Sequence, residues 1–144
     1  MKNLDSDVIR YISKKRLAHF ATCDIKGNPT VLPICFVYYN DNVYTPLDNK
    51  PKKTSPSNLK RVKNIIENPS VSVVIDEYND DWDRLSFVII QGTASLIDHG
   101  AEYEDALDQL CEKYVQYTKM KLKDLGLPVI KIVSDKIITW GNFD

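Results

Sequence analysis

The sequence predicts one mainly β domain, a six-stranded antiparallel barrel that is closed or partly open, with three flanking helices. Three observations predict it. Six segments are rich in the β-branched and aromatic residues that favour strands. The first three of these segments are joined by connections too short for a parallel crossover, so they must be antiparallel. No linker or repeat divides residues 1–144, and closing the sheet would remove its exposed edges.

Local patterns place each element along the chain. In order, we predict a helix over 4–16, strands over 17–23, 30–39 and 42–47, a helix over 56–67, strands over 71–78 and 85–97, a helix over 101–120 and a strand over 127–140. Asn40-Asp41 predicts a tight hairpin between the second and third strands. Gly92 predicts a bulge in its strand, and Ser134-Asp135 predicts a turn or bulge in the last one.

Capping and periodicity define the helices. Ser55-Pro56 fits the N-cap and first position of the second helix, because proline lacks only an N–H that would be unpaired there. Asn68-Pro69 ends it. In the third helix, apolar residues step by four, three, four and three positions, which predicts a narrow seam for core packing or for a partner. The seam is Tyr103, Leu107, Leu110, Tyr114 and Tyr117.

Composition excludes several classes of protein. Nineteen basic against 20 acidic residues give a net charge of −1, so no overall field favours nucleic acid or an acidic membrane. Cys23, Cys35 and Cys111 form neither a CxxC pair nor a disulfide framework, and two histidines do not predict a metal site. We find no signal peptide and no apolar run of the roughly 20 residues that a membrane helix needs. A cytoplasmic protein with reduced thiols is expected.

A lysine-rich turn is the strongest candidate for a ligand site. Lys50, Lys52, Lys53 and Thr54 stand just before the predicted helix, whose free N–H groups and positive dipole end favour an anion. Lysine acts as a point charge for phosphate. The alternative is an ordinary solvated surface turn, because no glycine-rich phosphate fingerprint is present.

Two tryptophans complete the set of candidate binding residues. Trp82 and Trp140 are flanked by polar or small residues, so they are candidates for stacking against a ligand. The alternative is packing at a subunit interface, where tryptophan is also enriched. No hydrolytic motif such as a nucleophile elbow occurs, so no catalytic residue is assigned.

Short motifs recur in order over residues 17–140. They are Phe20-Ala-Thr-Cys-Asp with Gly27-Asn-Pro, Leu32-Pro-Ile with Phe36, Val43-Tyr-Thr, Lys50-Pro-Lys-Lys-Thr54, Leu59-Lys-Arg-Val-Lys-Asn-Ile65 with Asn68-Pro69, Asp76-Glu-Tyr with Asp81-Trp82 and Leu85, Gly92-Thr-Ala, and Trp140. With this set the chain resembles the pyridoxamine 5′-phosphate oxidase-like, FMN-binding split-barrel superfamily. It looks closest to the branch of deazaflavin (F-420)-dependent enzymes.

The resemblance implies a Greek-key split barrel that pairs into a homodimer, with FMN or deazaflavin F-420 in a groove between the subunits. It implies that the strand over 30–36, with Leu32, Pro33 and Ile34, runs beside the cofactor ring through its backbone. It also implies that Tyr44, Thr45 and the lysine turn hold the phosphate.

This chain departs from the oxidases proper, which carry an arginine on the strand here spanning Thr30 to Ile34 and an Arg-Lys pair at Lys50-Pro51. Their arginine-bearing C-terminal segment has no counterpart in residues 140–144. We therefore do not expect pyridoxamine phosphate oxidation. The expected function is hydride transfer between a flavin or deazaflavin and an unidentified small substrate. A non-catalytic carrier or sensor of the same cofactor is the alternative.

Overall fold

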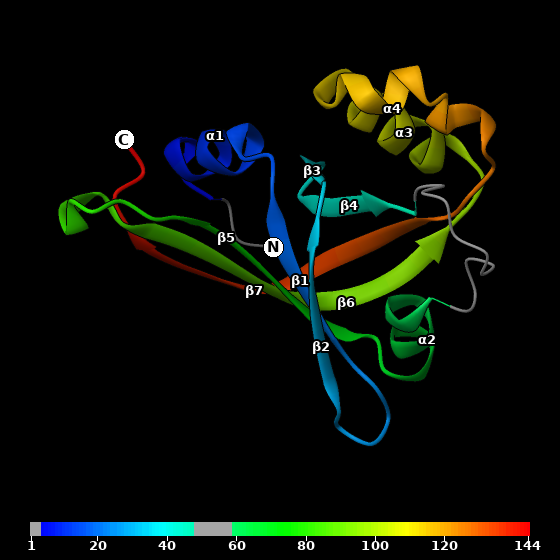
Figure 1. Ribbon diagram of the computed structural model, residues 1–144, viewed down its shortest axis with the longest axis horizontal. Helices are drawn as coiled ribbons and strands as arrows, with labels where there is room; N and C mark the ends of the chain where they lie inside the picture. Colours follow the sequence, from blue (N-terminus) through cyan, green and yellow to red (C-terminus); the bar gives the residue numbers. More distant parts are fainter. Residues whose placement is uncertain (1–3, 48–58) are drawn as a thin grey trace.

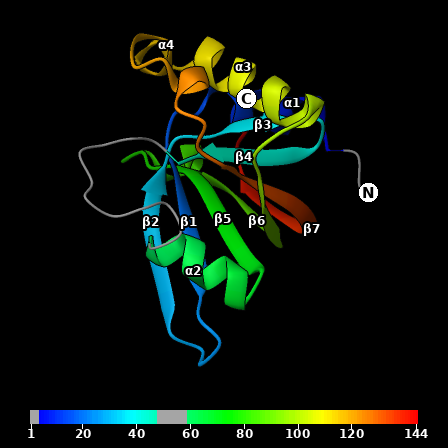
Figure 2. The same cartoon turned by 90° about the vertical axis from the view of Figure 1, so that its right-hand side faces the viewer.

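The computed structural model describes residues 4–47 and 59–144, which form a curled antiparallel sheet with helices around it (Figures 1 and 2). The elements are α1 (Ser6–Lys14), β1 (Ala18–Cys23), β2 (Pro29–Ile34), β3 (Val37–Tyr39), β4 (Asn42–Pro46), α2 (Lys60–Glu67), β5 (Ser70–Glu77), η2 (Trp82–Arg84), β6 (Ser86–Ile97), α3 (Ala101–Lys113), α4 (Val115–Lys119), η3 (Leu122–Asp124) and β7 (Val129–Gly141). The predicted mainly β fold is confirmed as a half-barrel with flanking helices.

Among the described residues the sheet has seven strands rather than the predicted six, in the order β2-β1-β5-β6-β7-β4-β3. The predicted strand over 30–39 is divided into β2 and β3 by a corner at Cys35-Phe36. Its uniform apolar character concealed the corner, because the bend is held by contacts from Lys113 and Tyr114, far along the chain. The hairpin at Asn40-Asp41 is confirmed: both residues have positive φ, 50° and 64°, as a tight two-residue turn requires.

β6 and β7 are the long strands of the fold and run beside each other through most of its length (Figure 1). Gln91 pairs with Lys136 and Gly92 pairs with Ser134, so Asp135 is the extra residue of a bulge. A Cβ at Gly92 would lie 2.1 Å from the carbonyl oxygen of Val133, which only glycine avoids. The bulge predicted at Gly92 and the turn or bulge predicted at Ser134-Asp135 are therefore confirmed, as two sides of the same bulge.

Two predicted helices differ in extent. α2 begins at Lys60 rather than at Pro56, with Leu59 in an extended conformation as its N-cap. Residues 48–58 lie outside the described chain. The helix predicted over 101–120 is divided into α3 and α4 by Tyr114, whose φ of −119° and ψ of 107° are extended. The apolar seam continues across this break, which is why periodicity alone did not reveal it.

The core has two parts. The inner face of the curled sheet contributes fully buried side chains from four central strands, including Phe20, Val73, Ile90 and Ile132. α3 lies over the β3–β4 hairpin (Figure 2). A second cluster of buried side chains joins them and contains Tyr103, Leu107 and Leu110. The predicted apolar seam is therefore core packing. Within the described residues, no helix combines the length and apolar character needed to cross a membrane.

Candidate functional site

β2 forms one edge of the sheet and pairs only with β1 within the described chain. Pro33 lies opposite His19 and has no N–H to donate to β1. Proline in an edge strand directs its nitrogen away from the neighbouring strand, so the backbones of Pro33 and Val31 face the free edge. This edge can offer a ligand the Val31 N–H and two carbonyl groups. The side chains of Leu32 and Ile34 lie with the sheet core instead.

Tyr44 and Thr45 use their side chains inside the fold. The Tyr44 hydroxyl donates to Oε2 of Glu102 on α3 at 2.6 Å, and Lys131 Nζ on β7 lies 2.7 Å from the same oxygen. Thr45 Oγ1 donates to the carbonyl of Cys35 at 2.8 Å. These two bonds tie β4 to α3 and to the β2–β3 corner. The phosphate contact predicted for these residues remains a prediction, and it would have to use their backbone or replace these bonds.

The electrostatics of this group follow from burial and from the shared carboxylate. Burial, reinforced by the hydrogen bond to Glu102, raises the pKa of Tyr44 to about 12. The hydrogen bonds from Lys131 and then from Tyr44 lower the pKa of Glu102, so its carboxylate is ionised at neutral pH. Tyr44 is therefore a neutral hydrogen-bond donor, unsuited to act as a general base there.

The β2–β3 corner is held from α3. The Phe36 N–H donates to the Tyr114 hydroxyl at 3.0 Å, and this hydroxyl lies 2.9 Å from the carbonyl of Arg16. Lys113 Nζ donates to the carbonyl of Phe36 at 2.9 Å and lies 4.0 Å from the centre of its ring. Burial, and secondarily the nearby Arg16 charge, lower the pKa of Lys113 to about 8. These contacts fix how β2 presents its free edge.

Lys50, Lys52, Lys53 and Thr54, the predicted phosphate residues, lie outside the described chain. The described helix α2 begins at Lys60, after the extended Leu59, and the cap predicted at Ser55-Pro56 lies outside the described residues. The free N–H groups of the first turn of α2 therefore follow Leu59 directly.

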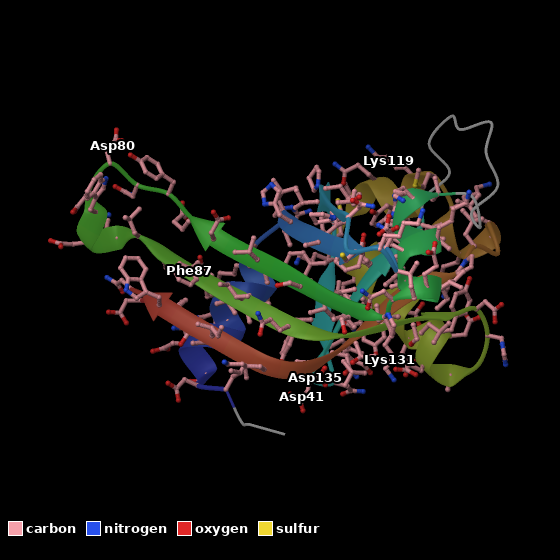
Figure 3. All side chains as sticks on the ribbon, turned by 90° about the horizontal axis from the view of Figure 1, so that it is seen from below. Asp41, Asp80, Phe87, Lys119, Lys131 and Asp135 are labelled. Atoms are coloured by element: carbon pink, nitrogen blue, oxygen red, sulfur yellow. The ribbon has the colours of Figure 1, made fainter. Side chains whose placement is uncertain are left out.

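The two tryptophans lie at the far end of the long β6–β7 strand pair, away from the part of β7 that pairs with β4. Trp82 belongs to η2 at the tip of the β5–β6 connection and is 71% exposed. Trp140 is 52% exposed and stacks on Phe87 with ring centres 5.6 Å apart. Figure 3 shows the labelled Phe87 and Asp80 at this end, far from Lys119 and Lys131. Measured along the sheet, three strand intervals separate β2 from β6 and four separate it from β7, about 14 Å and about 19 Å.

The outer face of the sheet connects the free edge of β2 with the Phe87–Trp140 pair. The strand registers align one cross-strand row in which no member is fully buried: Pro33, His19, Val74, Ile89 and Ile138. Val31, which neighbours this row, is 67% exposed. Partly exposed apolar side chains therefore extend from the free edge of β2 towards the Phe87–Trp140 pair.

Sequence reasoning missed the residues that support the site. Glu102, Lys131 and Tyr114 come from the C-terminal half of the chain, and no local motif marks them as partners of β4 or of the corner. Phe87 could have been found, because strand alternation places it on the same face as Ile89. Within the described ranges, no three histidine, cysteine or acidic side chains gather as a metal site.

Comparison with known proteins identifies the family. The sequence profile of the family described as Pyridoxamine 5'-phosphate oxidase matches residues 5–141. No curated protein matches the chain significantly.

Solved structures with the same fold are similar over nearly the whole chain. A conserved hypothetical protein from Mycobacterium tuberculosis has a TM-score of 0.78 at 14% identity, covering 97% of this chain and 86% of the other. The heme storage protein HutZ from Vibrio cholerae has a TM-score of 0.75 at 14% identity, covering 97% and 98%. An FAD-binding protein from Mesorhizobium loti has a TM-score of 0.68 at 17% identity, covering 94% and 92%. The chain belongs to the pyridoxamine 5'-phosphate oxidase family, in the FMN-binding split-barrel superfamily.

Proposed function

We propose that this protein is a flavin- or deazaflavin-dependent oxidoreductase that works as a homodimer, with each cofactor lying between two copies. Its substrate is a small molecule that remains to be identified. The observation that carries the proposal is the placement of the candidate residues at two ends of one sheet, which a second copy would bring together.

The residues present suit a planar cofactor. A ring system with polar edges needs backbone donors and acceptors beside it, and the free edge of β2 offers these at Val31 and Pro33. It also needs a flat apolar face, which the stacked Phe87 and Trp140 side chains offer. When bound, the cofactor supplies the hydride chemistry, while the protein binds and orients it. The FAD-binding protein of similar fold supports the choice of a flavin-type cofactor.

We propose the homodimer because these two groups lie apart on the sheet. Measured along the sheet, about 14 Å separates β2 from β6, which carries Phe87, and about 19 Å separates β2 from β7, which carries Trp140; both exceed the length of a flavin ring system. One ring system could contact both groups if one of them came from a second copy. The partly exposed apolar row on the outer face, which includes Val74, Ile89 and Ile138, supplies a surface that such a copy would cover.

The proposed cofactor is deazaflavin F-420 in preference to FMN, and the preference rests on resemblance around Asp76 to Leu85. The lysines of the turn over 50–53 would hold the phosphate that both cofactors carry. The missing arginines noted above argue against pyridoxamine phosphate as the substrate. Titration of the apoprotein with each cofactor tests this order, and clearly tighter FMN binding would reverse it.

A second candidate function is binding without turnover, as a carrier or sensor of the same cofactor. The similarity to the heme storage protein HutZ supports it, because that protein of the same fold is named for storage. The same groove would serve either function, so the two differ only in whether a bound substrate reacts.

The deciding experiment has two stages. The protein is purified from a host that makes both cofactors, and mass spectrometry identifies what copurifies. The loaded protein is then reduced and mixed with a panel of reducible acceptors while cofactor absorbance is followed. Multiple turnovers above the rate of free cofactor would support the oxidoreductase. Tight cofactor binding without turnover would favour the carrier, and the absence of any cofactor binding would refute both.

A further inference from the structure

A cavity of about 630 Å³ lies between α1, the start of β6 and the residues that follow β7. No residue of β2 or β4 lines it. Figure 1 shows the C-terminal segment passing between α1 and the far end of the hairpin formed by β5 and β6. Its volume is within the range of small-molecule sites. None of the residues assigned above to the cofactor lines it.

The cavity has a polar and aromatic floor. Ser86 is 4% exposed, and its hydroxyl donates to the Tyr11 hydroxyl at 2.9 Å. The proton of Tyr11 has only a long contact, 3.4 Å, to the carbonyl of Ser86, so it can be given to a ligand. Burial raises the pKa of Tyr11, which keeps this donor protonated at neutral pH. The ring of Phe143 packs edge-on against Tyr11, with centres 4.9 Å apart.

The walls are rich in cations. Arg10, Lys14 and Lys15 come from α1 and the residue after it, and Arg84 comes from η2 on the opposite side. Lys15 is paired with Glu77, which also lines the cavity. Lys14 has no ion-pair partner among the described residues.

Arg10 and Arg84 each form an exposed ion pair that can be broken at little cost in free energy. Arg10 pairs with Asp7 and Arg84 with Asp81, and neither aspartate lines the cavity. All four of these side chains are more than half exposed, and exposed pairs of this kind contribute little free energy. Either guanidinium can therefore turn towards a ligand without a large loss. Asp144 and Glu77 are the acidic groups of the lining.

We propose that this cavity is a second binding site, which takes a small aromatic anion such as an arene phosphate or carboxylate. The ring of the ligand lies against Tyr11 and Phe143, and its anionic group meets Lys14 and Arg84. A single inorganic ion would leave most of the volume and the aromatic floor unused. The proposal does not depend on the cofactor or on the oxidoreductase activity.

The test uses phenyl phosphate as the probe. Phenol and inorganic phosphate, which correspond to its two halves, are titrated separately as control ligands. Amide chemical shifts of the ¹⁵N-labelled full chain are followed during each titration. We expect saturable shifts at Ser86 and Phe143 with phenyl phosphate, and binding of either half weaker by about tenfold or more. The Lys50→Ala, Lys53→Ala variant should give the same shifts, which separates this site from the proposed cofactor phosphate site.

Variants locate the site. Lys14→Gln with Arg84→Gln should weaken phenyl phosphate binding by about tenfold or more, since two charge-assisted contacts are lost. The matched control Lys119→Gln, which removes an exposed lysine on α4, should leave it unchanged. Tyr11→Phe keeps the ring and should weaken binding severalfold through loss of the hydroxyl. Shifts that are absent near Ser86, or binding that these variants leave intact, would overturn the proposal.

Discussion

The Tyr114 hydroxyl links two segments that are 78 residues apart and determines how the chain turns between β2 and β3. It accepts from the Phe36 N–H while Lys113, its neighbour, donates to the Phe36 carbonyl. Both backbone polar groups of a corner residue are thus paired by side chains, which a bend away from a sheet requires. The free edge of β2 therefore depends on two residues of the C-terminal half.

Lys113 gives this corner a pH dependence. The folded pKa of about 8 lies below the ordinary 10.5, because burial and then Arg16 disfavour the charged form, although Cys35 opposes this slightly. Between these two values the unfolded chain binds more protons, so stability rises with pH. We predict that the unfolding free energy of the wild type, relative to Lys113→Met, increases from about pH 8 to about pH 10. Urea unfolding of both proteins across this range checks it, and parallel curves would contradict it.

The lysine turn carries the sharpest prediction about a side chain. We expect Lys50→Ala, Lys53→Ala to weaken cofactor binding by about a hundredfold or more, because each charge-assisted contact contributes about 1.5–3 kcal/mol. Fluorescence titration with cofactor gives the Kd. The control, Lys26→Ala with Lys119→Ala, removes the same charge from two exposed sites elsewhere. Equal affinity of the two double variants would move the phosphate to another part of the protein.

At the scale of elements, the bulge shared by β6 and β7 is a specific requirement of the fold. We predict that Gly92→Ala lowers the free energy of unfolding by about 1–3 kcal/mol, because its Cβ would collide with the Val133 backbone. Ser95→Ala, at an exposed position of the same strand, is the control and should change little. Urea denaturation measures both. A Gly92→Ala variant as stable as this control would mean that the bulge adjusts freely.

Sequence patterns predicted most elements because each has its own local signal. Turn residues located the hairpin at Asn40-Asp41, and Gly92 located the bulge. The breaks at Phe36 and Tyr114 left no such signal, because apolar patterning continues through both and only their mutual contact explains them. The cap predicted at Ser55-Pro56 lies outside the described residues, and the described α2 begins at Lys60 after the extended Leu59.

The candidate site was less predictable than the fold. The resemblance named residues of β2, β4 and the lysine turn together with Trp82 and Trp140, but the distance between them depends on strand order. The chain order of the strands does not reveal that four intervals separate β2 from β7. The internal partners of Tyr44 were also hidden, since Glu102 and Lys131 lie far along the chain.

At the scale of the whole molecule, two separate parts of the sheet would contribute different contacts to the cofactor. One end has the free edge of β2, and the other has the Phe87–Trp140 pair. If each cofactor is held by one end from each copy, damage at one end in one copy can be compensated by the other copy. A site built within one chain allows no such compensation.

Subunit complementation tests this central claim most directly. The Lys50→Ala, Lys53→Ala variant and a Phe87→Ala, Trp140→Ala variant are each expected to bind cofactor poorly. After equal amounts are mixed and exchanged by mild denaturation, half of the dimers contain one copy of each, and each of these has one intact site. We predict that about a quarter of all sites regain wild-type affinity, measured as tightly bound cofactor per chain. Binding no greater than the average of the two separate variants would contradict a site shared between copies.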